Sequence, residues 1–111
     1  MSLVSFSNFA ELKIVLGTIT DVCLVEDADR LLRLVVEVGE DKPRQVISGI
    51  REYFNNEKNL VGKQCVFLIN LESRIIKGYE SQGMILALNH DADFSLLVPD
   101  KSGLPDGTQV K

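Results

Sequence analysis

The strongest constraint on the fold is a series of short segments whose residues follow strand patterns rather than helical ones. Residues 31–38 alternate most clearly, because apolar residues occupy the even positions while Arg33 and Glu37 lie on the opposite face. Enrichment in β-branched and apolar residues predicts further strands along the chain. The predicted strands cover residues 15–25, 31–38, 44–50, 64–70 and 81–88.

One segment between the third and fourth predicted strands differs in composition. Residues 51–59 contain no β-branched residue and several charged ones, which predicts a short helix that Gly62 would help to end. This order fits an all-β domain, a five-stranded OB-fold barrel with a short helix between strands 3 and 4 and a C-terminal extension after His90. A small β-sandwich is the alternative, because strand order cannot be read from the pattern. Gly17 in the first strand is expected to allow a bulge or bend.

The composition indicates one folded domain that spans residues 1–111. Hydrophobic residues make up 45% and charged residues 25% of the chain, which is close to the average for globular domains and argues against disorder. No apolar run approaches the roughly 18 residues of a membrane span, and the first residues lack the pattern of a secretory signal. We therefore expect a cytoplasmic protein with no membrane partner.

The residues needed for catalysis or metal binding are scarce. His90 is the only histidine, so a nucleophile would have few partners that could act as a base. Cys23 and Cys65 lie far apart and outside any Cys-x-x-Cys spacing, which argues against a disulfide framework or a zinc site. Asp91 and Asp93 begin like a calcium loop, but no glycine or closing glutamate follows. We predict no catalytic residue, no metal and no cofactor, and hence a binding module rather than an enzyme.

The charge is acidic overall but unevenly distributed. The net charge of −4 argues against a strongly basic nucleic-acid binder. Residues 42–77 nevertheless carry seven basic and three acidic residues, whereas both flanking segments are negative. All the positive excess therefore lies in the middle third of the sequence.

The stretch from Asn70 to Met84 combines that positive charge with a strand start. Arg74 and Lys77 could meet phosphates from a turn at the barrel rim. Ser81 could hydrogen-bond the backbone or a base, and Met84 could offer an apolar surface to a stacked base. Taken alone this pattern is weak, since a charged hairpin is usually just solvated.

The sequence resembles the OB-fold tRNA-binding domain found at the C-terminus, or as the beta chain, of methionyl-tRNA synthetases. The same domain occurs in stand-alone tRNA-binding proteins, in the endothelial-monocyte-activating polypeptide and in a secretion-associated chaperone. The resemblance covers residues 9–110. Its markers are Ala28-Asp29-Arg30-Leu31-Leu32, Val36-Glu37-Val38-Gly39, Val46-Ile47-Ser48-Gly49-Ile50, Leu60-Val61-Gly62-Lys63, Asn70-Leu71, Arg74, Gly78, Ser81-Gln82-Gly83-Met84 and Leu97-Val98-Pro99.

This resemblance implies a tRNA-binding module, free-standing or associated with an aminoacyl-tRNA synthetase, that forms a homodimer through its N- and C-terminal segments. The alternative is a protein-binding or chaperone-like homodimer on the same fold whose nucleic-acid surface is weakened. Asn70 is expected to fix a turn more than to touch RNA. The candidate tRNA-binding residues are Arg30, Asn70, Arg74, Lys77, Ser81 and Met84.

The sequence departs from the family pattern where three cations are usual. Val15, Glu72 and Ile75 stand at those positions. Each lost phosphate contact lowers the salt slope of binding by roughly 0.9 for duplex-like nucleic acid. We therefore expect weaker and less salt-sensitive tRNA binding than in a family member that retains the three cations.

Overall fold

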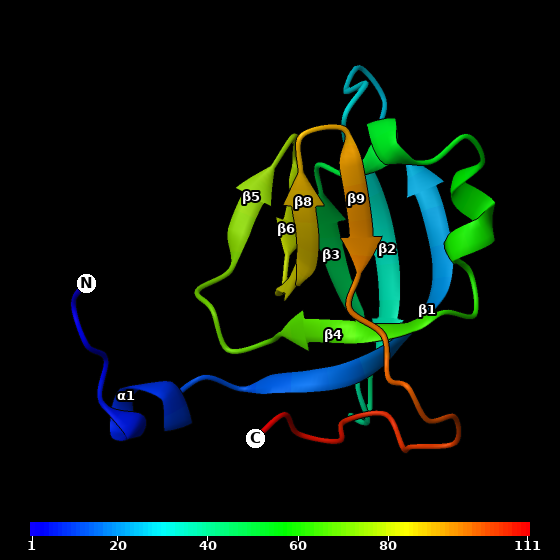
Figure 1. Cartoon of the computed structure of the whole chain (residues 1–111). Helices are drawn as coiled ribbons and strands as arrows, with labels where there is room; N and C mark the ends of the chain where they lie inside the picture. The colour runs from blue at the N-terminus through cyan, green and yellow to red at the C-terminus, as the bar shows by residue number, and fades with distance from the viewer.

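The structure is a computed structural model that describes residues 1–111. One antiparallel sheet has the strand order β3-β2-β1-β4-β7 and curls into a nearly closed barrel (Figure 1). This architecture confirms the predicted five-stranded OB-type barrel rather than the β-sandwich. Its strands are β1 (Ile14–Leu24), β2 (Leu32–Glu37), β3 (Arg44–Ser48), β4 (Gln64–Leu68) and β7 (Met84–Ile85).

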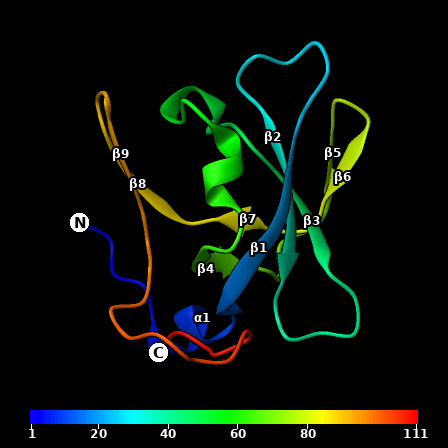
Figure 2. The same ribbon diagram turned by 90° about the vertical axis from the view of Figure 1, so that its right-hand side faces the viewer.

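Two hairpins extend from the barrel. In one, β5 (Arg74–Ile76) pairs with β6 (Tyr79–Ser81), and in the other β8 (Ala87–His90) pairs with β9 (Asp93–Leu96). The hairpins lie near one another in Figure 1, but Figure 2 separates them to opposite sides of the molecule. The turn of the β5–β6 hairpin lies at the same upper end as the loop between β1 and β2.

The barrel interior is filled by alternate residues of its strands. Leu32, Leu34 and Val36 of β2 are fully buried, which confirms the alternation read from the sequence. Cys65 and Phe67 of β4 face the same core. Burial raises the pKa of the Cys65 thiol to about 11, so this side chain acts as a small apolar group.

The single helix predicted over residues 51–59 is wrong. The chain instead forms two 3₁₀ turns, Arg51–Tyr53 and Glu57–Leu60. Between them the backbone is extended at Phe54, whose ring packs edge-on against Phe94 of β9 at 5.8 Å between ring centroids. The Asn56 side chain then accepts a hydrogen bond from the Lys58 amide and caps the second turn. Aromatic packing and a local cap therefore divide a segment that is too short to be a stable helix by itself.

Gly17 does not form the expected bulge. The register of β1 against β2 shifts between Ile19 and Asp21, whereas Gly17 pairs regularly with Cys65. A Cβ atom at Gly17 would lie 2.8 Å from the Val36 Cγ1 atom. Close packing against β2, rather than a bend, therefore requires glycine at this position.

The continuous strand predicted over residues 81–88 is also wrong, because it is broken into β6, β7 and β8. Gly83 turns the chain with a φ of 151°, and a Cβ atom there would lie 2.9 Å from the Leu68 carbonyl oxygen. After this turn Ile85 faces the core, while Met84 is 43% exposed. The glycine thus redirects the chain so that Met84 lies on the surface.

The C-terminal extension after His90 is present, and its last residues run back along β1. The Leu16 amide donates to the Thr108 carbonyl at 2.9 Å, and the Gly107 amide donates to the Leu16 carbonyl at 2.8 Å. The Val110 amide donates to the Ile14 carbonyl in the same way. The tail therefore supplies a backbone partner to the start of β1.

The chain before β1 forms a short helix, α1 (Phe6–Ala10), that buries none of its residues. Ser5 caps it, since its hydroxyl accepts a hydrogen bond from the Asn8 amide. No helix in the structure has the length and apolar character needed to cross a membrane.

Candidate nucleic-acid interface

The β5–β6 hairpin carries two of the predicted site residues. Arg74 is paired with Ser81, so the two side chains share the face that turns toward β3, while Ile75 and Glu80 share the other face. Lys77 and Gly78 form the two-residue loop, with φ values of 53° and 86°. Positive φ at both positions is the signature of a type I′ turn, which projects Lys77 from the hairpin tip.

The hairpin is attached to β3 by what we call the closing seam, formed by Arg44, Gln45, Ile47, Ser81 and Gln82. The Gln82 amide donates to the Gln45 carbonyl at 2.7 Å, and the Gln82 side-chain oxygen accepts from the Gln45 amide at 2.9 Å. The Arg44 guanidinium donates to the carbonyls of Ile69 and Gln82. One backbone hydrogen bond and several side-chain hydrogen bonds therefore close the barrel on the side where β3 and β7 are not paired as strands.

Ser81 belongs to this seam. Its hydroxyl accepts a hydrogen bond from the Ile47 amide at 3.0 Å and donates one to the Gly83 carbonyl at 3.1 Å, and the residue is 6% exposed. The geometry gives Ser81 a structural role rather than a free hydroxyl for RNA. The position of the Ser81 side chain therefore does not support its predicted contact with tRNA.

Asn70 also uses its side chain within the protein. Its Oδ1 atom accepts from the Lys13 amide at 2.7 Å, and its Nδ2 atom donates to the Glu11 carbonyl at 2.6 Å. These bonds tie the end of β4 to the segment before β1. The Asn70 side chain thus has a structural role, as the sequence predicts. It joins two segments that are distant in the sequence, however, and does not fix a single turn.

A depression of about 300 Å³, which we call the hairpin groove, lies between the inner face of the hairpin and the ends of β2 and β3. Met84 lines it, and so does Arg74, as their candidate roles require. Half of its lining residues are apolar. The groove is lined by Leu31, Ile47, Ser48, Gly49, Leu71, Glu72, Arg74, Ile76, Ser81, Gly83, Met84 and Ile85.

Arg74 lines this groove, Arg30 and Lys77 lie near it, and none of the three forms an ion pair. Arg30 precedes Leu31, which lines the groove, and it lies on the β1–β2 loop at the end of the molecule where the hairpin turn lies (Figure 1). The structure thus brings Arg30 to the same end of the barrel as the two hairpin cations.

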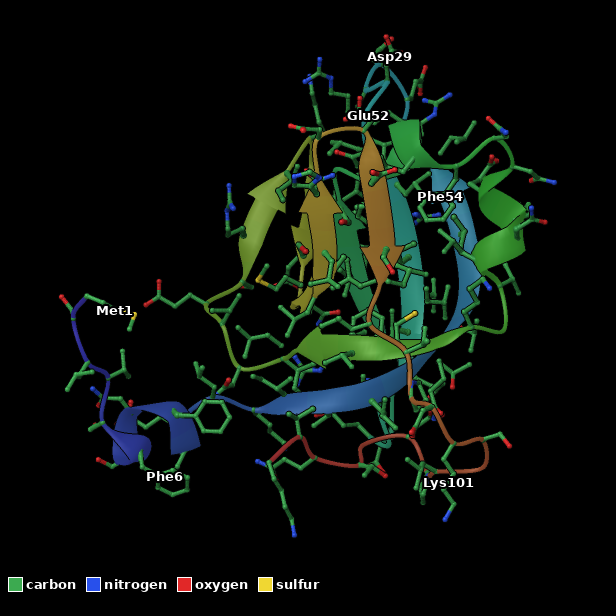
Figure 3. The ribbon with its side chains drawn as sticks, viewed as in Figure 1. Met1, Phe6, Asp29, Glu52, Phe54 and Lys101 are labelled. Carbon is green, nitrogen blue, oxygen red and sulfur yellow. The ribbon has the colours of Figure 1, made fainter.

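The same end also carries acidic side chains. Asp29 on the β1–β2 loop and Glu52 on the first 3₁₀ turn both lie there (Figure 3). The Arg44 cation begins β3, at the other end of that strand from Ser48, and it is not free, because its guanidinium binds the Glu40 carboxylate at 2.6 Å and 3.0 Å. This pairing lowers the pKa of Glu40 and raises that of Arg44. Free positive charge near the groove is therefore confined to a few residues.

Arg33 is a neighbouring cation that sequence reasoning did not include. Its guanidinium lies 5.2 Å from the centre of the Tyr79 ring on β6. Its place opposite the core face of β2 was visible in the sequence. Its proximity to the hairpin was not, because that depends on how β6 packs beside β3.

Of the three positions at which family cations are replaced, Val15 contradicts the expectation of a lost phosphate contact. Val15 is 1% exposed and belongs to the hydrophobic core, where a phosphate has no access. Ile75 is 71% exposed on the outer face of the hairpin, and Glu72 lines the groove. Only the last two replacements therefore change the surface.

No group of three or more histidine, cysteine or acidic side chains is placed to hold a metal ion. The Cys65 thiol, whose pKa is raised to about 11 by burial, is enclosed in the core.

Known proteins resemble this chain over almost its whole length. Residues 14–109 match the model of a family described as "Putative tRNA binding domain". The chain is 37% identical over 108 residues to a methionine–tRNA ligase of Streptococcus pneumoniae and 41% identical over 109 residues to that of Deinococcus radiodurans. These matches cover 96% and 98% of this chain, but the chain spans only 16% of the length of either relative.

Solved structures give the same result. A MetRS-related protein from Pyrococcus horikoshii superposes with a TM-score of 0.88 at 26% identity, and both chains are covered completely. The chaperone CsaA from Bacillus anthracis superposes with a TM-score of 0.85 at 26% identity, over 99% of this chain and 100% of the other. Sequence and structure therefore agree that the chain belongs to the tRNA-binding domain family.

Proposed function

We propose that this protein is a non-catalytic tRNA-binding module that recognises the shape of tRNA rather than its sequence. The observation that carries the proposal is the pair of unpaired cations, Arg74 and Lys77, on a hairpin beside an open groove. Contacts to phosphates position a nucleic acid without reading its bases, which suits a module that accepts many tRNAs.

The module would act beside a partner enzyme, either free-standing or associated with methionyl-tRNA synthetase in the cytoplasm. The curated relatives that it matches are methionine–tRNA ligases, which supports a synthetase as partner. Such a module raises the effective concentration of tRNA at the enzyme without contributing to the chemistry.

Titration of the protein with labelled total tRNA at several salt concentrations tests this proposal. We expect Arg74→Glu to weaken binding roughly tenfold and to reduce the salt slope by about one unit, because it removes a phosphate contact. Lys101→Glu is the matched control, since Lys101 lies on the C-terminal tail away from the hairpin (Figure 3) and the charge change is identical. Equal binding by a folded Arg74→Glu variant would remove this surface as the tRNA site.

The second candidate function is a protein-binding homodimer on the same fold. It is favoured by an apolar depression of about 320 Å³ between α1 and the C-terminal residues, lined by Phe6, Phe9, Leu12 and Val110 among others. Phe6 is 80% exposed, which is unusual for so large an apolar side chain. Phe94 and Leu96 of the C-terminal segment pack against the core and would contribute less to a dimer.

Light scattering after size-exclusion chromatography tests the dimer. We expect twice the chain mass of 12.3 kDa at micromolar concentration. Phe6→Ser should shift the population toward monomer, whereas a monomeric parent protein would contradict the homodimer. The tRNA titration separates the two functions, because the protein-binding candidate predicts no response to Arg74→Glu.

A further inference from the structure

The hairpin groove has the dimensions and lining of a site for one small flat group. Its volume of about 300 Å³ lies at the lower end of the range for small-ligand pockets, and its walls are half apolar. A duplex is too wide for such a depression. A single ring, with one face against Met84, matches its size.

Three polar side chains of the groove form no hydrogen bond or ion pair with the rest of the protein. They are the Ser48 hydroxyl, the Glu72 carboxylate and the Arg74 guanidinium. The Ser81 hydroxyl of the same groove is different, because it is fully used in the closing seam. A few unused polar groups that converge on an apolar depression are what fixes the orientation of a bound ligand.

Gly49 contributes a bare stretch of backbone to the groove, and the fold does not require glycine there. A Cβ atom at Gly49 would meet only the Arg30 carbonyl oxygen, at 3.9 Å, and the residue does not have positive φ. Gly17 and Gly83, in contrast, are dictated by close packing. Glycine without a structural reason, on the wall of a groove, permits a ligand to approach the backbone closely.

The charges of the groove indicate the chemistry of the ligand. Arg74 and the nearby Lys77 suit the phosphates that flank a nucleotide. Glu72 repels phosphate, but a carboxylate accepts hydrogen bonds from the exocyclic amino groups of bases, as it does from the N4 amino group of cytosine. Uracil has no amino group, and carbonyl oxygens flank its single ring N–H.

We propose that the hairpin groove holds one unpaired nucleobase of the bound RNA, and that Glu72 makes it prefer bases with an exocyclic amino group over uracil. This inference rests on the proposed tRNA-binding function and refines it, because a preference at one unpaired base is added to phosphate contacts that follow the shape of the tRNA. The base lies against Met84 and the Gly49 backbone, its amino group donates to Glu72, and its phosphate contacts Arg74.

The test uses labelled single-stranded heptanucleotides of cytidine and of uridine, titrated directly and as competitors of labelled total tRNA. A blunt RNA duplex serves as a third competitor. We expect oligocytidine to bind about fivefold more tightly than oligouridine, which is the typical net effect of one additional hydrogen bond. The duplex should compete poorly, because its bases are paired.

Two variants assign that preference to the groove. Glu72→Gln should remove most of the preference for cytidine, because an amide can both donate and accept. Glu80→Gln removes the same charge from the outer face of the hairpin. It should change the affinity for both oligonucleotides by the same factor and therefore keep the preference for cytidine. Gly49→Val should weaken both oligonucleotides at least fivefold while its melting temperature stays near that of the parent, because its side chain fills the groove.

The outcomes separate this inference from the function on which it rests. If tRNA binds but the parent protein treats cytidine and uridine alike, or if Glu72→Gln keeps the preference, the inference is wrong and the proposed function stands. If oligocytidine is preferred but tRNA does not bind, the proposed function fails instead. An unfolded protein is added as a further competitor of labelled tRNA. If it displaces tRNA and neither oligonucleotide does, the groove binds peptides and the inference is wrong.

Discussion

The closing seam and the hairpin groove are adjacent, yet they treat polar groups in opposite ways. In the seam, the Ser81 hydroxyl and the Arg44 guanidinium are each bonded to at least two partners within the chain. In the groove, Ser48, Glu72 and Arg74 have none. The stretch from Asn70 to Met84 therefore contains two kinds of residue. Some hold the barrel closed, and others remain available to a ligand.

The largest effect expected is on the seam. Ser81→Ala should lower the free energy of unfolding by about 2 kcal/mol, because the Ile47 amide would lose its only side-chain acceptor in a buried position. Urea denaturation measures this change. Ser48→Ala is the matched control from the groove and should change stability by less than about 0.5 kcal/mol. Loss of tRNA affinity by a stable Ser81→Ala variant would place Ser81 in the binding surface and break the comparison.

A smaller effect of opposite sign is expected at the hairpin tip. Lys77 adopts a φ of 53°, which asparagine tolerates better than lysine, so Lys77→Asn should raise stability by about 0.5–1 kcal/mol. The same change removes a cation and should weaken tRNA binding. Thermal denaturation and tRNA titration measure the two effects. Lys77→Arg retains the charge and the strained backbone, so it should change neither stability nor tRNA binding. A loss of binding in that variant would count against a simple phosphate contact.

The smallest effect concerns the acid sensitivity of the seam. Arg44 lowers the pKa of Glu40 below its ordinary value of 4.5, so the pair stabilises the fold above that pH and this contribution is lost as the pH falls through the lowered pKa. The parent should therefore be more stable than Glu40→Gln at neutral pH, and the difference should shrink below about pH 4.5. Denaturation at pH 7 and pH 3 measures the difference, and a gap that does not narrow in acid would show that the pair is not the cause.

The barrel could be predicted because its information is local. The alternation from Leu32 to Val38 defines a buried face within a single strand, and the structure confirms it. The two 3₁₀ turns could not be predicted, since the ring of Phe54 packs against Phe94, forty residues later in the chain. The break at Gly83 depends likewise on the Leu68 carbonyl of a neighbouring strand.

The candidate site was predicted less completely, for the same physical reason. Arg74, Lys77 and Met84 lie on or beside the groove because hairpin residues stay close to one another in space. The hydrogen bond between the Ser81 hydroxyl and the Ile47 amide joins residues thirty-four positions apart, so the sequence does not show that this hydroxyl is already used within the protein. The expected loss of a phosphate contact at Val15 is wrong for the same reason, because β4 and the C-terminal tail, both distant in sequence, bury this residue.

The return of the C-terminal tail along β1 has a consequence for truncated chains. In a product that ends before residue 107, the start of β1 carries amide and carbonyl groups, such as those of Leu16, whose partners in the tail are missing. An open strand edge of this kind attracts other extended chains and favours aggregation. Truncated products of this kind should therefore aggregate more readily than the full chain and depend more on chaperones that shield unpaired strands.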